Sequence, residues 1–236
     1  MNLLFIHGSG GSRESWHYQL RAFPDARAVN LPGHPEGEPC TSIAECVEWL
    51  RDQLAEGERK DLALAGHSLG GAVALQYALS YPDELAAIIL IGSGARLRVH
   101  PQYLEQLEAA LEAGSDVDEA LNVGYELVDP KLAEVLQRRR AENGAAVTLA
   151  DLRACDRFDV MDRVGEIRIP MLAVCGSDDI MTPPKYSLYL ADAMPDARVT
   201  IIPSGTHMVF AEQPDAVNRA ILEFLSELGS EASGPR

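Results

Sequence analysis

The sequence predicts an α/β protein built on a mostly parallel sheet. Short continuous apolar runs recur along the chain, as expected for strands buried on both faces of a sheet. Helix-compatible segments alternate with these runs, which favours parallel strands joined by right-handed crossovers. Several runs end in glycine-rich or polar loops, and ligand sites of open α/β sheets lie at such strand ends.

Length and composition limit the classes of protein to consider. A chain of 236 residues is long enough for one large domain, and 47% hydrophobic with 24% charged residues is ordinary for a globular protein. No apolar run approaches the roughly 18 to 20 residues that span a bilayer, and the N-terminus reads as a strand, so we expect a cytoplasmic protein. A net charge of −16 opposes binding to nucleic acid or anionic lipid.

The first part of the chain supplies three predicted strands and two helices. The apolar run 3–6 is followed by the glycine-rich stretch 7–11, and a helix is expected over 12–20. Ser42 and Glu45 have the spacing of a capping box at the start of a second helix. The expected strands are 3–6, 26–29 and 62–65, and the expected loop is 30–39.

The second part resumes the sheet after a helical insertion. Strands are expected at 87–91, 171–175 and 199–202, and a last amphipathic helix over 214–228. Between them, 95–165 shows helical periodicity with capping signals at Ser115, Asp129-Pro130 and Thr148, which predicts about four helices. The predicted organisation is therefore a core over 1–94 and 166–228, a helical cap over 95–165, and a disordered tail over 229–236.

The stretch Gly66-His67-Ser68-Leu69-Gly70 carries the clearest chemical signal. A strand that turns sharply into a helix at Ser68 projects its hydroxyl above the sheet, and the crowded turn requires small residues two positions away. The following helix directs its positive N-terminal end toward Ser68. The alternative, a glycine-rich turn with an incidental serine, is weakened by the polar residues at the ends of two later strands.

These two later strands end in titratable residues that complete a nucleophilic site. A serine hydroxyl needs a neutral imidazole to take its proton and a carboxylate to orient that imidazole. His207 follows one strand and Asp178 and Asp179 follow another, so either aspartate is a candidate for the acid. The chain order serine, aspartate, histidine is the order expected of an α/β-hydrolase arrangement.

With these motifs, the chain resembles the α/β-hydrolase superfamily, of the small, cap-bearing serine esterase type, over almost its whole length. The matching motifs are 7–11, 66–71, 176–179 with Pro183 following, and 205–207. The resemblance implies Ser68 as nucleophile, His207 as base and Asp179 as acid. It also implies an oxyanion hole formed by the backbone amides of Ser9 and Leu69, where two fixed N–H groups stabilise the tetrahedral intermediate.

The chain departs from that family in two places. Many relatives begin with two antiparallel strands that are missing here, so we expect a sheet of about six strands. The family's frequent Asp-x-Pro-Gly-x-Gly loop reads Asn30-Leu31-Pro32-Gly33-His34-Pro35, which alters one wall of the site. Dehalogenases and epoxide hydrolases have an aspartate nucleophile, so Ser68 disfavours both.

The remaining polar residues receive structural interpretations. His7 is expected to be a structural hydrogen-bonding residue, and the side chain of His67 is expected to point away from the base. His17, His34 and His100 are predicted to be surface or loop residues. Histidines and carboxylates are too dispersed for a metal site, and the mechanism needs no cofactor. The glycine-rich loop 7–11 lacks the full pattern of a phosphate or dinucleotide cradle.

Cationic and thiol side chains are also given structural or solvated roles. Arg96 and Arg98, at the start of the predicted cap, either grip a substrate carboxylate or remain solvated. The run 138–140 of three arginines is expected on a solvated helix face. The four cysteines lack Cys-x-x-Cys spacing, and Cys175 is expected to be a small buried residue.

The sequence thus favours a cofactor-independent hydrolase of a small-molecule carboxylic ester, acting through an acyl-enzyme. Thioesterase, lactonase, acyltransferase, carbon–carbon bond hydrolase and perhydrolase activities use the same triad and remain alternatives. A non-catalytic ligand-binding protein of the same fold is disfavoured because it would not require all three triad residues.

Overall fold

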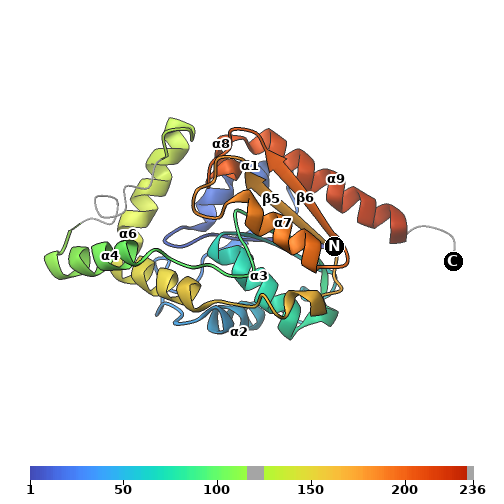
Figure 1. Ribbon diagram of the computed structural model, residues 1–236, viewed down its shortest axis with the longest axis horizontal. Coiled ribbons are helices and arrows are strands. Elements are labelled where there is room, and N and C mark those ends of the chain that lie inside the picture. The colour runs from blue at the N-terminus through green and yellow to red at the C-terminus, as the bar shows by residue number, and fades with distance from the viewer. Residues whose placement is uncertain (116–124, 233–236) are drawn as a thin grey trace.

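The computed structural model describes residues 1–115 and 125–232, the last three of these by their backbone alone. It consists of a central sheet with helices on both faces (Figure 1). None of the helices in these ranges is long and apolar enough to cross a membrane.

Six parallel strands form the sheet, in the order β2-β1-β3-β4-β5-β6. This confirms the predicted α/β-hydrolase fold with a sheet of about six strands. The register aligns the carboxyl ends of neighbouring strands, since Gly66 on β3 lies opposite Ile6 on β1 and Leu90 on β4. The strands are β1 (Asn2–Ile6), β2 (Arg27–Val29), β3 (Leu62–His67), β4 (Leu85–Ile91), β5 (Met171–Gly176) and β6 (Ala197–Ile202).

Two apolar layers cover the sheet. Along β3, Leu64 packs into the layer under α2 and α3, whereas its neighbours Ala63 and Ala65 pack into the layer under α8 and α9. Both faces are buried, which explains why the strands are continuous apolar runs. The helices of the core are η1 (Arg13–Trp16), α1 (His17–Ala22), α2 (Ile43–Gln53), α3 (Leu69–Ser80), η2 (Pro82–Glu84), η3 (Val164–Glu166), α7 (Pro184–Ala193), α8 (Val209–Glu212) and α9 (Pro214–Ala232).

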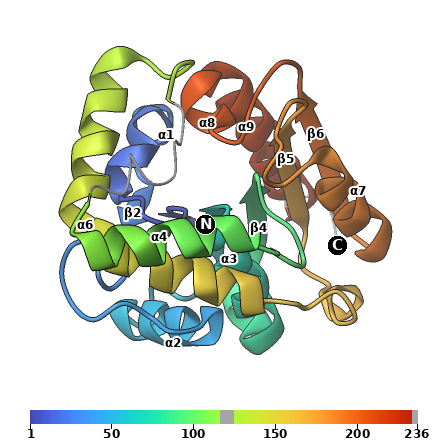
Figure 2. The ribbon, with the colours of Figure 1, turned by 60° about the vertical axis from the view of Figure 1, so that its left-hand side comes forward.

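Two long helices, α4 (Pro101–Ala113) and α6 (Pro130–Arg157), stand between β4 and β5 in the chain, and we call them the inserted helices. The part of α6 after Gly144 packs beside α4 across one end of the core, through Leu107 and Leu149 (Figures 1 and 2). As expected, Asp129 caps α6, because its carboxylate accepts hydrogen bonds from the Lys131 and Leu132 amides. The prediction of about four helices falls partly on 116–124, outside the described residues.

Three local expectations in this half of the chain are wrong. Thr148 does not begin a helix: the non-helical Gly144 separates two helical parts of α6, the second part starts directly after it, and the Thr148 hydroxyl donates to the Gly144 carbonyl. Arg140 is not solvated but buried, with its guanidinium against the Tyr125 ring and hydroxyl. Helix α9 extends to Ala232, past the expected end at residue 228, because no proline interrupts it there.

Candidate active site

Ser68 lies at the sharp turn between β3 and α3. Its backbone has φ 52° and ψ −113°, a conformation that is strained for a residue with a side chain. Hydrogen bonds hold the turn on both sides. The Ser68 N–H donates to the Ile91 carbonyl at 3.0 Å, and the Ser93 hydroxyl donates to the Ser68 carbonyl at 2.8 Å. The strain is therefore compensated by contacts with β4 and the loop that follows it.

The small residues around Ser68 allow neighbouring backbones to approach closely. A Cβ added at Gly66 would lie 2.1 Å from the Gly70 carbonyl carbon, and one added at Gly70 would lie 2.2 Å from the Ile6 carbonyl oxygen. The glycine-rich loop passes directly beside the serine, since a Cβ at Gly8 would lie 3.2 Å from the Ser68 Cβ. Both predicted glycine requirements of the turn are thus met.

Asp179 and His207 lie in direct contact at the ends of β5 and β6. The Nδ1 atom of His207 is 2.9 Å from the Oδ2 atom of Asp179, whose side chain is fully buried. Asp178, the other candidate acid, is instead paired with the Ser177 hydroxyl at 2.7 Å. Asp179 and His207 also pack against Gly92 at the end of β4, because a Cβ added there would lie 3.3 Å from Asp179 Oδ2 and from His207 Nδ1.

Four donors in all point at the Asp179 carboxylate. Its Oδ1 atom accepts the Met181 and Thr182 amides, each at 2.9 Å, and its Oδ2 atom accepts the Thr182 hydroxyl at 2.8 Å besides the His207 ring. Burial alone would raise the pKa of Asp179. The effect of burial is outweighed by the hydrogen bond and charge of His207 and by the two hydrogen bonds of Thr182. These contacts hold the pKa of Asp179 well below its usual range.

His67 does not point away from the base, which corrects the sequence prediction. Its ring lies 4.7 Å from the ring of His207 and 4.6 Å from that of Phe210, between centroids. Burial, and then the neighbouring His207, lower the pKa of His67 to about 3, so its neutral ring uses Nε2–H to donate to the His207 carbonyl at 3.0 Å. His67 therefore supports the loop that carries His207.

The two predicted oxyanion amides belong to segments on either side of Ser68. Leu69 is the first residue of α3 and is completely buried. Ser9 lies in the glycine-rich loop after β1, and its hydroxyl is 3.7 Å from the Cys155 sulfur of α6. Helix α3 begins directly after Ser68, so the positive end of its dipole lies beside the serine.

The structure also places the other histidines and the two arginines that the sequence analysis considered. His7 is structural as expected, because it contacts the Gly8 carbonyl through Nδ1 and accepts the Leu31 amide at Nε2. His34 lies in a loop as expected but is 1% exposed, so a surface position is wrong. Arg96 and Arg98 are half exposed and lie 3.7 and 3.9 Å from Asp159, an arrangement that fits the solvated alternative.

Two further histidines and Cys175 lie outside the centre. His17 is exposed, and His100 is exposed and caps α4 by accepting the Gln102 amide. Cys175 is fully buried within β5, as predicted. Within the described ranges, no group of three or more His, Cys, Asp or Glu side chains is arranged to hold a metal ion.

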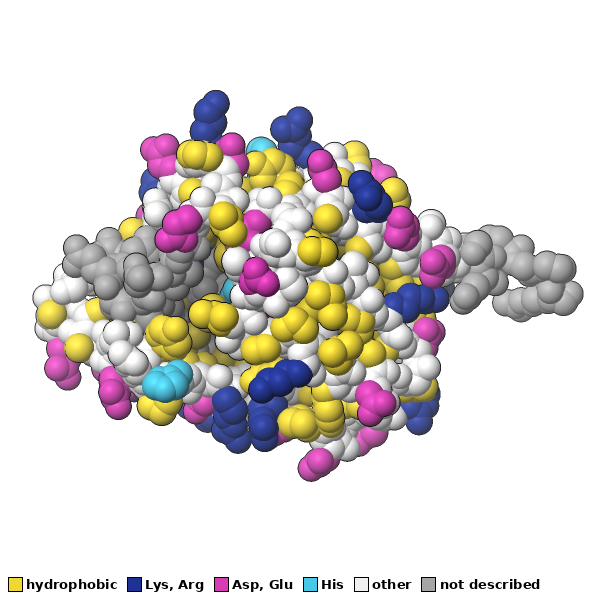
Figure 3. Space-filling model, turned by 45° about the horizontal axis from the view of Figure 1, so that its top comes forward, with side chains coloured by type: hydrophobic (Ala, Val, Ile, Leu, Met, Phe, Trp, Pro, Cys, Tyr) yellow, Lys and Arg dark blue, Asp and Glu magenta, His cyan; other side chains and the backbone are white. Residues whose placement is uncertain are grey.

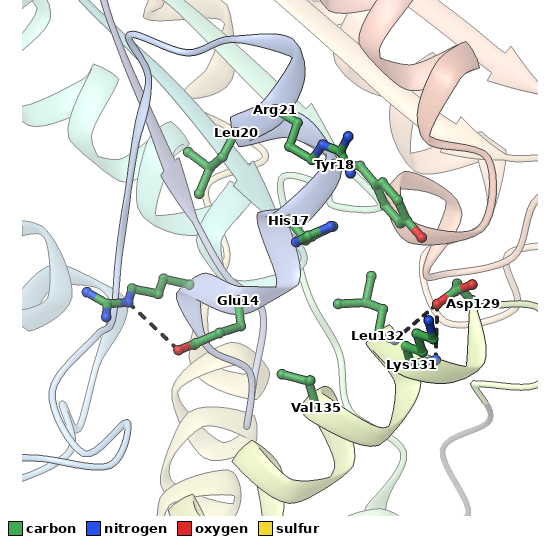
Figure 4. A pocket seen from close by; sticks show the side chains of 10 residues that line it. Glu14, His17, Tyr18, Leu20, Arg21, Asp129, Lys131, Leu132 and Val135 are labelled. Carbon is green, nitrogen blue, oxygen red and sulfur yellow. Dashed lines mark hydrogen bonds and ion pairs between the residues drawn. The ribbon is translucent and has the colours of Figure 1, made fainter.

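A cleft of about 680 Å³ lies between α1 and the start of α6, away from these residues (Figure 4). Leu20, Leu132 and Val135 form its apolar part, and its charged groups have both signs. Ser68, Asp179 and His207 do not line it. Its charged lining residues are Arg13, Glu14, Arg21, Asp129 and Lys131.

Sequence reasoning missed several residues that shape the site. Thr182 follows Asp179 by three positions, and an aspartate that accepts amides two and three residues later is a known turn pattern, so a local signal exists. Ser93, Asn143 and Asp151 carry no comparable signal, because their partners lie 25 to 141 positions away. Only the tertiary fold brings them to the site.

Comparison with known proteins agrees with this architecture. Residues 3–220 match the model of the alpha/beta hydrolase family. The chain belongs to the α/β hydrolase family. The Ser68 turn and the Asp179–His207 pair occupy the strand ends where this fold carries its chemistry.

Three relatives illustrate the range of the family. A solved structure described as a thermophilic esterase is 30% identical, with a TM-score of 0.82 over 97% of this chain and 90% of that one. The putative carbamate hydrolase RutD of Escherichia coli is 26% identical over 96% of this chain and 91% of its own length. The dihydrolipoyllysine-residue acetyltransferase component of the Pseudomonas putida acetoin cleaving system is 30% identical over 94% of this chain, which spans only 63% of that protein.

Proposed function

We propose that this chain is a serine hydrolase that cleaves a small-molecule carboxylic ester through an acyl-enzyme intermediate. The observation that carries the proposal is the Asp179–His207 hydrogen bond of 2.9 Å, which lies at the same edge of the sheet as a serine held at positive φ. A buried carboxylate on Nδ1 fixes the tautomer in which Nε2 is free to accept a proton.

In the first half of the reaction, Ser68 Oγ bonds to the ester carbonyl carbon and passes its proton to His207 Nε2. The carbonyl π electrons move to the oxygen, which the amides of Ser9 and Leu69 stabilise. The intermediate collapses, the carbon–oxygen bond to the alcohol breaks, and His207 protonates the departing alkoxide. Ser68 is left acylated.

In the second half, His207 takes a proton from water as the water oxygen bonds to the acyl carbon. The second tetrahedral intermediate collapses, the bond to Ser68 Oγ breaks, and His207 returns the proton to the serine. The products are the carboxylic acid and the free enzyme, so the cycle consumes one water and needs no cofactor.

An apolar substrate suits the surface next to the acid. Ile180 and Met181, which follow Asp179 directly, are 86% and 44% exposed. Hydrophobic side chains reach the surface over a wide area of the face drawn in Figure 3. The inserted helices α4 and α6 would act as the cap that selects the acyl or alcohol group. The likeness to the thermophilic esterase, at 30% identity, supports an ester as the substrate.

The test is a panel of p-nitrophenyl esters of increasing acyl length, assayed beside a thioester, a lactone and an aryl carbamate. We expect turnover of at least one ester and its loss in Ser68→Ala. Esters rejected by a folded enzyme that turns over another acyl compound would replace the ester by that compound and keep the mechanism. Activity that survives Ser68→Ala would contradict the mechanism itself.

A further inference from the structure

Side chains of the inserted helix α6 form hydrogen bonds with several backbone groups of the glycine-rich loop after β1. The Gly10 amide donates to Asp151 Oδ2 at 2.8 Å, while the Asn143 side-chain amide donates to the Gly10 and Gly11 carbonyls at 3.0 and 2.8 Å. Asp151 and Asn143 are 4% and 7% exposed. Consecutive peptide groups of the loop are thus fixed by side chains from a helix outside the core.

Contacts within the loop hold the preceding peptide group. The Gly8 carbonyl accepts the Gly11 amide at 3.0 Å and lies 2.8 Å from His7 Nδ1. Because a trans peptide is planar, fixing the Gly8 carbonyl on one side directs the Ser9 N–H to the opposite side. The orientation of the Ser9 N–H therefore depends on the contacts of its own peptide group, through the Gly8 carbonyl, and on those of the next one, through the Gly10 N–H.

A buried histidine holds the Asp151 carboxylate in place. His34 Nε2 lies 3.0 Å from Asp151 Oδ2, and His34 Nδ1 lies 3.0 and 3.2 Å from the Pro32 and Leu31 carbonyls. Both ring nitrogens therefore face acceptors, which favours the imidazolium form. Burial lowers the pKa of His34, but the hydrogen bond and charge of Asp151 outweigh it and raise that pKa. Neutral His7 is the adjacent ring, 4.6 Å away.

The bend in α6 brings both contacts to the same loop. Gly144 has φ 80°, which only glycine adopts at low cost, and the two halves of α6 run in different directions from it (Figures 1 and 2). Asn143 lies immediately before the bend and Asp151 two turns after it. In a straight helix Asn143 and Asp151 would not face the loop in the same way, so the bend at Gly144 is part of the contact between α6 and the glycine-rich loop.

We propose that Asp151 is a positioning residue: with His34 and Asn143, it holds the glycine-rich loop so that the Ser9 amide faces the reacting oxygen. This inference rests on the proposed function. It assigns α6 a role in assembling the oxyanion site in addition to any role as a roof over the substrate. Removal of one oxyanion donor in a serine hydrolase lowers kcat by about 10²–10³-fold, so a misoriented amide has a measurable effect.

The test compares Asp151→Ala, Asp151→Asn and Thr148→Val for the best ester of the panel. Asp151→Ala removes the acceptor, and we expect kcat to fall about 10–100-fold with KM within threefold of wild type. Asp151→Asn keeps an acceptor oxygen and should retain most of kcat. Thr148→Val is the matched control: the buried Thr148 side chain packs against Gly10, where an added Cβ would lie 2.8 Å from its hydroxyl, but that hydroxyl donates within α6 and not to the loop.

A transition-state analogue separates positioning from a general loss of structure. A trifluoromethyl ketone adds to the serine and forms a tetrahedral oxyanion, so its inhibition constant should rise in Asp151→Ala by about the same factor as kcat/KM falls. The product carboxylate should bind as before. Unchanged kcat in Asp151→Ala, or lost activity with unchanged affinity for the ketone, would overturn the proposal.

Amide hydrogen exchange keeps this inference distinct from the proposed function. In folded wild-type protein the Gly10 amide should be protected, and Asp151→Ala should remove that protection while leaving Leu64 in β3 unaffected. Equal exchange of Gly10 in both proteins would show that Asp151 does not hold the loop, whatever the activity. Protection of Gly10 in a protein that hydrolyses nothing would instead show that the proposed function has failed.

Discussion

The Asp179–His207 pair and the glycine-rich loop lie at the same edge of the sheet but are stabilised in different ways. All four hydrogen bonds to the Asp179 carboxylate come from Met181, Thr182 and His207, which lie in loops of the core. The glycine-rich loop is held in part by Asn143 and Asp151, which lie on the inserted helix α6. The Asp179–His207 pair is therefore held by residues of the core, whereas part of the glycine-rich loop is held by α6.

The largest expected effect is on the core side of this comparison. Asp179→Asn should lower kcat by about 10⁴-fold, because the amide no longer holds His207 in the required tautomer. The measurement is steady-state hydrolysis of the best p-nitrophenyl ester, with folding checked by circular dichroism. Asp178→Asn is the matched control, since Asp178 contacts Ser177 and not His207. Loss of turnover in Asp178→Asn alone would contradict the assignment of the acid.

A smaller effect is expected from Thr182, whose hydroxyl donates to Asp179 Oδ2 at 2.8 Å and also lies 3.2 Å from His207 Nδ1. Thr182→Val should lower kcat about tenfold with little change in KM, as one charge-assisted hydrogen bond is lost. Thr182→Ser keeps the hydroxyl and should restore most of the rate. Equal losses in the two variants would indicate that Thr182 acts by packing and not through its hydroxyl.

Combining the two sides tests whether they act separately. Since Thr182 and Asp151 share no hydrogen-bond partner, the effects of Thr182→Val and Asp151→Ala on kcat/KM should multiply in the double variant to within about twofold. The readout is a double-mutant cycle in which all four proteins are assayed together. A double variant no worse than the poorer single variant would show that the two regions form one coupled unit.

The smallest expected effect is on stability and arises from the contrast between buried histidines. Burial lowers the pKa of His7 and of His67 to about 3, so each stays neutral in the native protein. Unfolded histidine binds a proton near pH 6.5, and the unfolded state is therefore favoured as the pH falls below that value. The raised pKa of His34 has the opposite sign: its contribution is complete below about pH 6.5 and is lost as the pH rises through that raised pKa.

Urea unfolding at pH 7 and pH 5 measures this contrast. Replacing His67 by Gln should reduce the loss of unfolding free energy between these pH values by roughly 1–2 kcal/mol relative to wild type. His17→Gln, at an exposed position, is the control for replacing a histidine by glutamine. An identical pH dependence in His67→Gln and wild type would contradict a neutral, buried His67.

The sequence predicts the sheet well because strands that are buried on both faces consist of continuous apolar runs. It also identifies Ser68, Asp179 and His207 as candidates, since the turn chemistry and the chain order are local properties. The orientation of His67 cannot be predicted, because it depends on Phe210 and the His207 loop. Thr148 is a predicted helix cap, but the second helical part of α6 already starts after the non-helical Gly144.

The α6 contact with the glycine-rich loop has no local signal at all. Asp151 and Gly10 are separated by 141 positions, and helical periodicity indicates which face of a helix is buried but not which loop it meets. The prolines and glycine around His34 indicate a surface or loop position. Only the docked helix supplies the carboxylate that makes the burial of His34 favourable.

Covalent labelling with a fluorophosphonate tests the central claim most directly, because the reagent phosphonylates an activated serine. Peptide mapping by mass spectrometry should find one adduct per chain, on Ser68, and none in Ser68→Ala. Labelling should be far slower in Asp179→Asn and moderately slower in Asp151→Ala, in line with the different supports of the acid–base pair and the glycine-rich loop. A folded wild-type protein that acquires no adduct, or acquires it at another residue, would contradict the account.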